Sequence, residues 1–184
     1  MEAYCSTKAR KTGVIFPTDT YNGFRALGFN TFIALQSALA FHILHVSFPT
    51  CESWIPDLRF PVYVERIARA KHGSDTESYT MEGTFDEGRY DRIFKKFDED
   101  QKGGLYFSEI VTMWKANRNV LDLIGWTFQV FLWGYLWLLA ADPQTGILDE
   151  RSVRKQYDGS LYYELEKRQK SGNRLPFVRG GELW

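Results

Sequence analysis

A twelve-residue acidic segment constrains the fold of this chain more than any other feature. Residues 98–109 read Asp-Glu-Asp-Gln-Lys-Gly-Gly-Leu-Tyr-Phe-Ser-Glu. They match the EF-hand pattern D-x-D/N-x-D/N-G-x5-E, in which oxygen atoms surround a calcium ion and a glycine makes the sharp turn. Asp98 and Asp100 are the expected side-chain ligands at the start of the loop, Gly104 the carbonyl ligand, and Glu109 the bidentate ligand.

Lys102 departs from this pattern. It stands at the fifth position of the loop, where a third acidic or amide side chain is expected. Because an ammonium group there repels a divalent cation, two interpretations stay open: a loop that binds calcium, and a metal-free loop kept for packing. Apolar residues at helical spacing predict a helix on each side of the loop. These residues are Tyr90, Ile93, Phe94, Phe97, Ile110, Val111 and Trp114.

Two other segments resemble EF-hand loops that have lost their acids. Residues 142–150 keep a turn glycine and an apolar residue at the strand position. Residues 13–19 keep the glycine, the strand residue and the final carboxylate, whereas the earlier acidic positions carry Lys8, Arg10 and Thr12. Because EF-hands usually occur in pairs, we expect both segments to form loops, and we expect neither to bind calcium.

Two long apolar stretches stand out. Residues 31–48 are interrupted by polar side chains that include His42 and His45, which is weak for a membrane span of about 20 apolar residues. A buried helix or a shallow lipid-surface anchor fits better. Residues 120–140 are apolar on nearly every face, which predicts a helix buried in the core, with lipid association as the alternative.

A proline-rich segment follows the first apolar stretch. Pro49, Pro56 and Pro61 each lack a backbone donor and fix φ, so no regular helix is expected to cross the segment. After Pro61, apolar residues at helical spacing predict a short amphipathic helix that ends near His72.

Together these elements predict a mainly α-helical fold of degenerate paired EF-hands with an apolar helix and a proline-rich segment. A length of 184 residues with 44% hydrophobic content suffices for a substantial core, so we expect one domain over residues 1–184. Within it, residues 1–30 would form the EF-hand remnant and residues 31–61 the apolar helix and proline-rich segment. Residues 62–184 would hold the His72 segment and a C-terminal EF-hand-like pair.

The balance of charge argues against one class of partner. Lys plus Arg and Asp plus Glu both number 23, so no net field attracts the chain to nucleic acid. The 2 cysteines do not form the dense disulfide framework of a small secreted domain, and the N-terminal residues lack the apolar core of a secretory signal. We therefore expect an intracellular protein. The aromatic content of 16% favours a large apolar contact surface: a core, an oily pocket or a membrane face.

Five segments, in their order along the chain, carry a family resemblance. They are YNGFRALGFN at 21–30, FPVYV at 60–64, AKHGSDTESY at 70–79, KANRN at 115–119 and QYDGSL at 156–161. With them the chain resembles the caleosins, EF-hand proteins associated with lipid droplets and membranes in plants and fungi. Many caleosins are described as haem-dependent peroxygenases. Each segment alone is a weak signal, but the Lys-His-Gly-Ser-Asp run at 71–75 together with the proline-rich segment before it and Ala-Asn-Arg-Asn at 116–119 after it is specific.

The resemblance implies a haem held by histidine. In the family one histidine lies in the Lys-His-Gly-Ser-Asp motif, which makes His72 the expected iron ligand. The alternative is that His72 only ends a helix and bonds to nearby carbonyls. A second histidine lies ahead of the first calcium loop, near Ala3 or Tyr4 here, so a bis-histidine site is not available. One axial imidazole suffices, because peroxide needs the sixth position of the iron. His42 or His45 would carry a proton between the peroxide oxygens; otherwise they are hydrogen-bonded core histidines.

Three functions follow from this interpretation. The favoured one is a haem-dependent peroxygenase that transfers oxygen from a hydroperoxide to an unsaturated lipid or another apolar substrate. The second is a haem-free biosynthetic enzyme, a cyclase or isomerase, with acid–base groups among His42, His45, Asp75 and Tyr79. The third is a non-catalytic protein that responds to calcium at a lipid surface. The expected location is the cytoplasm, a lipid droplet or an endomembrane.

Overall fold

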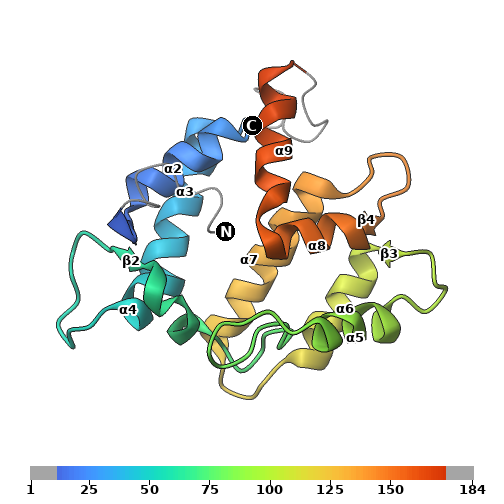
Figure 1. The fold of residues 1–184 in the computed structure, drawn as a ribbon, viewed down its shortest axis with the longest axis horizontal. Coiled ribbons are helices and arrows are strands. Elements are labelled where there is room, and N and C mark those ends of the chain that lie inside the picture. The colour runs from blue at the N-terminus through green and yellow to red at the C-terminus, as the bar shows by residue number, and fades with distance from the viewer. Residues whose placement is uncertain (1–11, 173–184) are drawn as a thin grey trace. The chain divides into compact units, whose positions relative to one another are not determined.

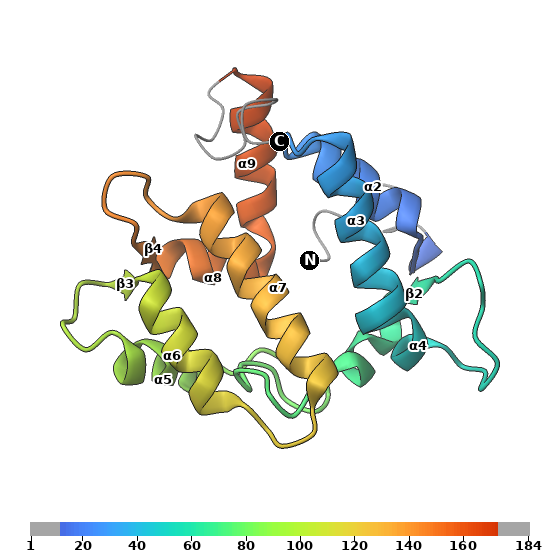
Figure 2. The ribbon, with the colours of Figure 1, turned by 180° about the vertical axis from the view of Figure 1, so that it is seen from behind.

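Residues 12–172 of the computed structural model fall into two mainly helical units, shown from opposite sides in Figures 1 and 2. The first unit contains residues 12–70 and 159–172, and the second is Lys71–Asp158. The predicted division at residue 61 thus falls inside the first unit. Of the positions discussed above, Ala3, Tyr4, Lys8 and Arg10 lie outside the described residues.

The first unit begins with a short strand and ends with a late helix of the chain. Its elements are β1 (Val14–Ile15), α2 (Pro17–Ala26), α3 (Thr31–Leu39), η1 (Ala40–Val46), α4 (Ser47–Thr50), β2 (Val62–Tyr63), η2 (Val64–Ala70) and α9 (Ser160–Lys170). Strands β1 and β2 pair antiparallel, with Ile15 opposite Val62. Ile15 and Val62 are both buried, so this two-residue ladder is part of the core.

The second unit repeats an order of helix, loop, strand and helix. Its elements are α5 (Glu87–Phe97), β3 (Gly104–Leu105), α6 (Phe107–Asn117), α7 (Leu123–Ala140), β4 (Leu148–Asp149) and α8 (Glu150–Asp158). Strands β3 and β4 pair antiparallel, with Leu105 opposite Leu148. The pairing brings the loop that joins α5 to α6 beside the loop that joins α7 to α8, which Figure 2 shows.

Local sequence signals set the ends of α5. The Asp86 carboxylate accepts a hydrogen bond from the Arg89 N–H, with 3.0 Å between Oδ1 and N, and so caps the helix. The helix ends at Phe97, and Asp98 begins the acidic loop. Its buried face carries Tyr90, Ile93, Phe94 and Phe97. This is the face that their spacing predicts.

A π-helical turn interrupts the long helical stretch Thr31–Thr50. The N–H of Ser47 bonds to the carbonyl of His42, five residues earlier, which is the π pattern. Pro49 has no N–H to continue the helix, which ends at Thr50.

Polar side chains of this helix hold the end of the proline-rich loop. His42 Nδ1 donates to the carbonyl of Phe60 at 2.7 Å, and Ser47 Oγ donates to the carbonyl of Pro61 at 2.8 Å. Residues 51–61 contain no helix, in agreement with their proline content. The loop therefore returns to the helix at a fixed point and leads directly into β2.

The segment after Pro61 differs from the prediction. Val62 and Tyr63 pair with β1 instead of starting a helix, and η2 is a 3₁₀ helix that ends at Ala70, before His72. Helical spacing over so few residues does not exclude a two-residue strand, and the partner strand lies far away in the sequence.

Helix α7 is buried on one face only, where the sequence predicted burial all around. The buried residues are Gly125, Gln129, Trp133, Leu136 and Leu139. Other apolar residues are well exposed, among them Leu123 at 61% and Val130 at 49%. Composition shows that a helix is apolar, but it does not show which of its faces has a packing partner.

Two helical stretches among the described residues, Thr31–Thr50 and Leu123–Ala140, are long and apolar enough to cross a membrane. Length and composition do not distinguish such a helix from a core helix. His42 of the first stretch is fully buried and hydrogen-bonded.

Candidate functional site

His72 lies in a turn of the second unit, beside α7. Its side chain is 12% exposed, and its ring centroid is 5.4 Å from that of Phe128. Nδ1 faces Oδ1 of Asp122 at 3.9 Å. Nε2 is buried and has no hydrogen-bond partner among residues 12–172. One ring nitrogen thus faces a carboxylate, and the other is a buried nitrogen without a hydrogen-bond partner in the described part of the chain.

Asp122 connects the His72 turn to α7. Its carboxylate accepts hydrogen bonds from the N–H of Ser74 (2.9 Å) and from the N–H of Gly125 in the first turn of α7 (2.9 Å). Ser74 in turn accepts a hydrogen bond from the Asn119 N–H through its Oγ (3.0 Å). Although burial alone would raise the pKa of Asp122, the hydrogen bonds from Ser74 and Gly125 and the nearby His72 lower it. A charged carboxylate therefore faces the imidazole.

Gly73 lies close to the side chain of Asn119. A Cβ atom at position 73 would lie 2.6 Å from Asn119 Nδ2. The segments 71–75 and 115–119, which the sequence singles out separately, therefore pack against each other in the structure.

Asp75 and Tyr79, named in the haem-free hypothesis, have partners nearby. Asp75 Oδ1 accepts a hydrogen bond from the Glu77 N–H (2.7 Å), and Asp75 lies 3.7 Å from the Lys71 ammonium. Burial raises the pKa of Asp75, and the hydrogen bond and the charge of Lys71 offset this only in part. The Tyr79 hydroxyl donates to the carbonyl of Tyr157 (2.8 Å).

His42 and His45 belong to the first unit, where both are buried. Both ring nitrogens of His42 have partners: Nδ1 bonds to the Phe60 carbonyl at 2.7 Å, and Nε2 to Thr20 Oγ1 at 2.8 Å. Because a carbonyl only accepts, Nδ1 carries the proton and Nε2 accepts from the hydroxyl. Burial lowers the pKa of His42, which keeps the ring neutral. This arrangement favours a core histidine, and the proton-carrier role of His42 and His45 stays a prediction.

The acidic loop brings its predicted ligands together around a lysine. Oxygens of Asp98, Asp100 and Glu109 lie within 4.8 Å of one another, close enough to hold a metal ion. Lys102 Nζ occupies the space between them, at 2.9 Å from Asp98, 2.7 Å from Asp100 and 2.8 Å from Glu109. The N–H of Gly104, the expected carbonyl ligand, donates to Asp98 Oδ2 at 3.2 Å. In this arrangement the loop does not fit a calcium ion, because an ammonium group stands where the ion would bind.

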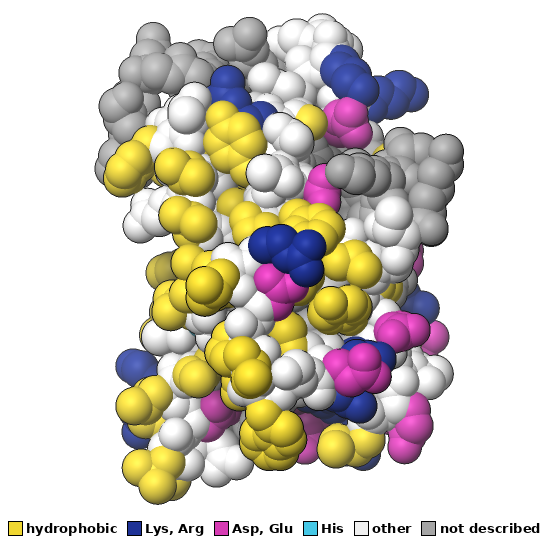
Figure 3. Space-filling model, turned by 90° about the vertical axis from the view of Figure 1, so that its left-hand side faces the viewer, with side chains coloured by type: hydrophobic (Ala, Val, Ile, Leu, Met, Phe, Trp, Pro, Cys, Tyr) yellow, Lys and Arg dark blue, Asp and Glu magenta, His cyan; other side chains and the backbone are white. Residues whose placement is uncertain are grey.

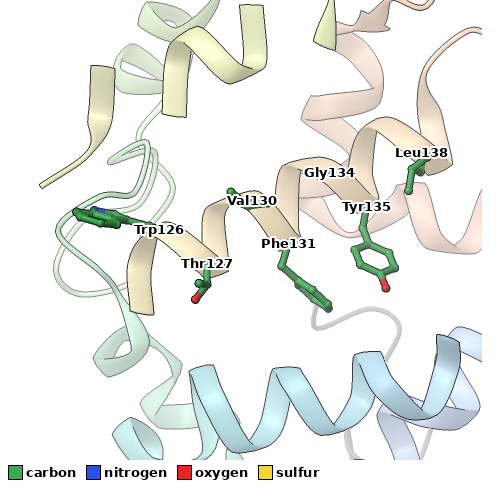
Figure 4. A pocket seen from close by; sticks show the side chains of 7 residues that line it. All are labelled: Trp126, Thr127, Val130, Phe131, Gly134, Tyr135 and Leu138. Atoms are coloured by element: carbon green, nitrogen blue, oxygen red, sulfur yellow. The ribbon is translucent and has the colours of Figure 1, made fainter. Parts of the chain in front are cut away.

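An apolar groove runs along α7. Its volume is about 480 Å³, and Figure 4 shows Phe131 and Tyr135 projecting from the same side of the helix, with ring centroids 4.6 Å apart. A Cβ atom on Gly134 would meet nothing within 4 Å, so the missing side chain widens the groove. The lining residues are Trp126, Thr127, Val130, Phe131, Gly134, Tyr135 and Leu138. Such a surface suits an apolar chain or ring.

Sequence reasoning named His72 but missed its neighbours. Asp122 precedes an apolar helix, which is a signal for a helix cap and not for a partner of His72. The groove was missed because its opening at Gly134 depends on which face of α7 is packed. The role of Asp122 becomes visible only when residues 71–75 and 115–125 are seen together.

Comparison with known proteins identifies the family of the chain. The family model described as "Caleosin related protein" matches residues 8–166, which is most of the chain. The chain belongs to the caleosin family. No solved structure matches it. The predicted family membership is thus confirmed.

Three curated relatives of this caleosin are proteins of Lilium longiflorum and Arabidopsis thaliana. It is 38% identical to "Peroxygenase" of Lilium longiflorum over 163 residues, covering 89% of this chain and 67% of the relative. It is 33% identical to "Probable peroxygenase 4" of Arabidopsis thaliana over 161 residues, covering 88% and 82%. It is also 34% identical to a "Probable inactive peroxygenase-like protein" of Arabidopsis thaliana over 151 residues, covering 82% and 71%. Similarity at this level alone does not separate active from inactive relatives.

Proposed function

We propose that this caleosin is a haem-dependent peroxygenase in which Nε2 of His72 binds the iron. The observation that carries the proposal is the buried Nε2 without a partner among the described residues, on a ring whose Nδ1 faces the Asp122 carboxylate. Histidines that bind metals commonly place the second ring nitrogen against a carboxylate, which fixes the ring and makes the ligand more basic. Two relatives named as peroxygenases support the reaction class.

The reaction needs only a hydroperoxide and an apolar substrate. When bound, the haem supplies the iron at which the hydroperoxide gives up one oxygen atom. The O–O bond breaks, the hydroperoxide ROOH becomes the alcohol ROH, and the substrate gains the oxygen as an epoxide, alcohol or sulfoxide. No external reductant is required.

The residues of α7 supply orientation and an apolar surface. The Asp122 carboxylate lies 3.9 Å from Nδ1 of His72, and the Phe128 ring packs against the imidazole. The groove on the same helix, with Phe131 and Tyr135 among its lining residues, would bind an unsaturated lipid chain and exclude water from it.

The helical framework is part of the proposal. We interpret α5 to α8 as a pair of EF-hands joined through β3 and β4, the first built on residues 98–109 and the second on residues 142–150. Residues 51–61 would form the proline knot of the family, held against the helix by His42 and Ser47. The first pair of strands, β1 and β2, supports an EF-hand origin of residues 13–19.

Exposed apolar side chains in the first unit favour docking on a lipid droplet or endomembrane. On the face drawn in Figure 3, hydrophobic side chains gather over much of the surface. In the proline-rich loop Trp54 is 94%, Ile55 80% and Leu58 83% exposed. The preceding helix also exposes Phe32, Leu35, Leu39, Ile43, Leu44 and Phe48. Apolar surface of this extent is typical of a contact with a membrane or another lipid surface. The lipid would then be the source of apolar substrates.

An absorption spectrum of the purified chain with added haemin tests the enzyme. We expect a Soret band, and we expect oxygen transfer from a fatty-acid hydroperoxide to an unsaturated fatty acid. His72→Ala should lose the band and the activity, whereas His45→Gln, a change at another buried histidine, should keep the band. Circular dichroism checks that both variants are folded.

Three results would overturn the proposal or its iron ligand. Folded wild-type protein that takes up no haem would remove haem chemistry, and turnover without haem or peroxide would favour the cyclase or isomerase alternative. A Soret band that persists in His72→Ala would assign the iron ligand to another residue.

Flotation with artificial lipid droplets tests the docking surface. The triple variant Trp54→Ser, Ile55→Ser, Leu58→Ser should bind at least about tenfold more weakly, because it removes most of the apolar area of the loop. Met81→Ser, a change at an apolar residue that is 78% exposed in the second unit, is the control. Equal flotation of all three proteins would exclude the loop as the contact.

A further inference from the structure

We infer that the ammonium group of Lys102 is a built-in substitute for calcium, so that the loop at residues 98–109 is closed without any metal. An ammonium group has three N–H donors and no acceptor. In this loop the three donors meet oxygens of Asp98, Asp100 and Glu109 at 2.7–2.9 Å. The cation therefore has a full set of partners, and all three side chains are predicted calcium ligands.

The second carboxylate oxygens of Asp98 and Glu109 also accept hydrogen bonds. Asp98 Oδ2 accepts hydrogen bonds from the N–H groups of Gly103 (2.8 Å) and Gly104 (3.2 Å). Glu109 Oε2 accepts one from the Tyr106 N–H (2.7 Å), at the start of α6. These bonds bend the backbone around the first acid and fix the last acid at the next helix. The loop thus has an ordered conformation with its own cation at the centre.

The lysine is held in place from several directions. Its side chain is only 11% exposed, and Nζ lies 4.7 Å from the centroid of the Tyr106 ring, a cation–π contact. Its own N–H donates to Asp98 Oδ1 (3.1 Å). Burial alone would raise the pKa of Asp98, but hydrogen bonds from Lys102 and Gly103 lower it to about 2.

Calcium would have to displace this group. Calcium takes six to eight oxygen ligands, and Lys102 removes one ligand position while adding a positive charge beside the ion. The loop would then pair with its neighbour through β3 and β4 at any calcium concentration. The inference does not depend on the proposed oxygen transfer, and it predicts a caleosin whose second unit does not respond to calcium.

Isothermal titration of the full-length chain with calcium, after treatment with EDTA, tests the inference. The wild type should give no binding heat, and its melting temperature should be the same in EDTA and in millimolar calcium. Lys102→Asp, which restores an acid at the fifth position, should bind calcium. Its melting temperature should rise by roughly 5–10 °C at a hundredfold excess of calcium over the Kd. The double variant Lys102→Asp, Glu109→Gln is the matched control and should lose that gain.

A second variant tests the inference in case Lys102→Asp does not fold. Lys102→Met keeps most of the length of the side chain but removes the charge. It should therefore melt at a lower temperature and bind terbium, a luminescent calcium substitute, where the wild type does not. Stoichiometric calcium binding by the wild type that is lost in Glu109→Gln would overturn the inference. Terbium binding by the wild type as strong as that by Lys102→Met would also overturn it.

Discussion

The two units build the same strand pair from different loops. In each, a glycine with positive φ precedes the first strand: Gly13 at +67° and Gly103 at +79°. In each, the carbonyl of that glycine accepts a hydrogen bond from the residue after the second strand, Val64 (2.9 Å) or Glu150 (3.0 Å). The shared hydrogen bonds show that the pair is a backbone arrangement that tolerates very different side chains.

A carboxylate closes the first loop of each pair in the same way. Asp19 Oδ2 accepts from the Phe16 N–H (3.0 Å), and Glu109 Oε2 accepts from the Tyr106 N–H (2.7 Å). The units differ in what else the carboxylate holds, because Glu109 also binds Lys102. The last acid of the loop therefore caps a helix in both units, and this role does not require a metal.

The buried strand residues should give the largest effects. Leu148→Ala should lower the free energy of unfolding of the second unit by about 2–5 kcal/mol, because a fully buried leucine leaves a cavity. Val62→Ala is the matching change in the first unit and should cost about 1–3 kcal/mol there, since valine is smaller. Urea denaturation followed by tryptophan fluorescence measures both. A cost below about 1 kcal/mol for Leu148→Ala would mean that the pair does not organise its unit.

Removing the closing carboxylate should destabilise the two loops to different extents. Glu109→Ala should cost about 2 kcal/mol, because it removes a helix cap and a partner of Lys102, whereas Asp19→Ala should cost about 1 kcal/mol for the cap alone. Thermal unfolding checks the difference. Equal losses would show that the contact of Glu109 with Lys102 adds no stability.

Low pH should reduce the free energy of unfolding of the first unit, and His42 is the expected cause. Burial lowers the pKa of this imidazole, so the folded chain binds fewer protons than the unfolded chain. Its contribution is therefore fully present above the ordinary value near 6.5 and is lost as the pH falls below it, by at most about 1.4 kcal/mol per pH unit. Urea denaturation between pH 8 and pH 5 should show this slope in the wild type and a smaller slope in His42→Gln. Identical slopes would exclude His42 as its source.

Two glycines with free space around them should respond in opposite directions. A Cβ atom meets nothing within 4 Å at Gly13 or at Gly134, so backbone conformation alone decides the result. Gly134→Ala, inside α7, should stabilise by about 0.5–1 kcal/mol, and Gly13→Ala, at positive φ, should destabilise by about 1 kcal/mol. Melting temperatures measure both changes.

Gly134→Phe tests the groove on α7. The variant should keep the fold and block the groove, which oxygen-transfer assays would detect. Undiminished activity would exclude the groove as the substrate site.

The sequence predicted the elements that depend on local spacing. The apolar spacing before the acidic loop placed the buried face of α5, and the prolines excluded a helix from residues 51–61. The family resemblance is confirmed by the family model over residues 8–166. Each of these signals lies within a short stretch of chain, where helical period and proline geometry act directly.

The features that the sequence missed depend on contacts between distant residues. Val62 was assigned to a helix because its strand partner, Ile15, lies in another part of the chain. Lys102 was recognised as a defect of the calcium loop, but only the structure places its ammonium group among three carboxylates. The contact of His72 with Asp122 likewise joins two segments that carry no shared local signal.

Chemical rescue of His72→Gly tests the proposed iron ligand most directly. Glycine removes the imidazole and leaves its space, so free imidazole can enter and replace it. We predict that the variant lacks the Soret band and oxygen transfer, and that added imidazole restores both to a substantial fraction of the wild-type values. Variant protein that binds haem and transfers oxygen equally well with and without imidazole would contradict the assignment of His72.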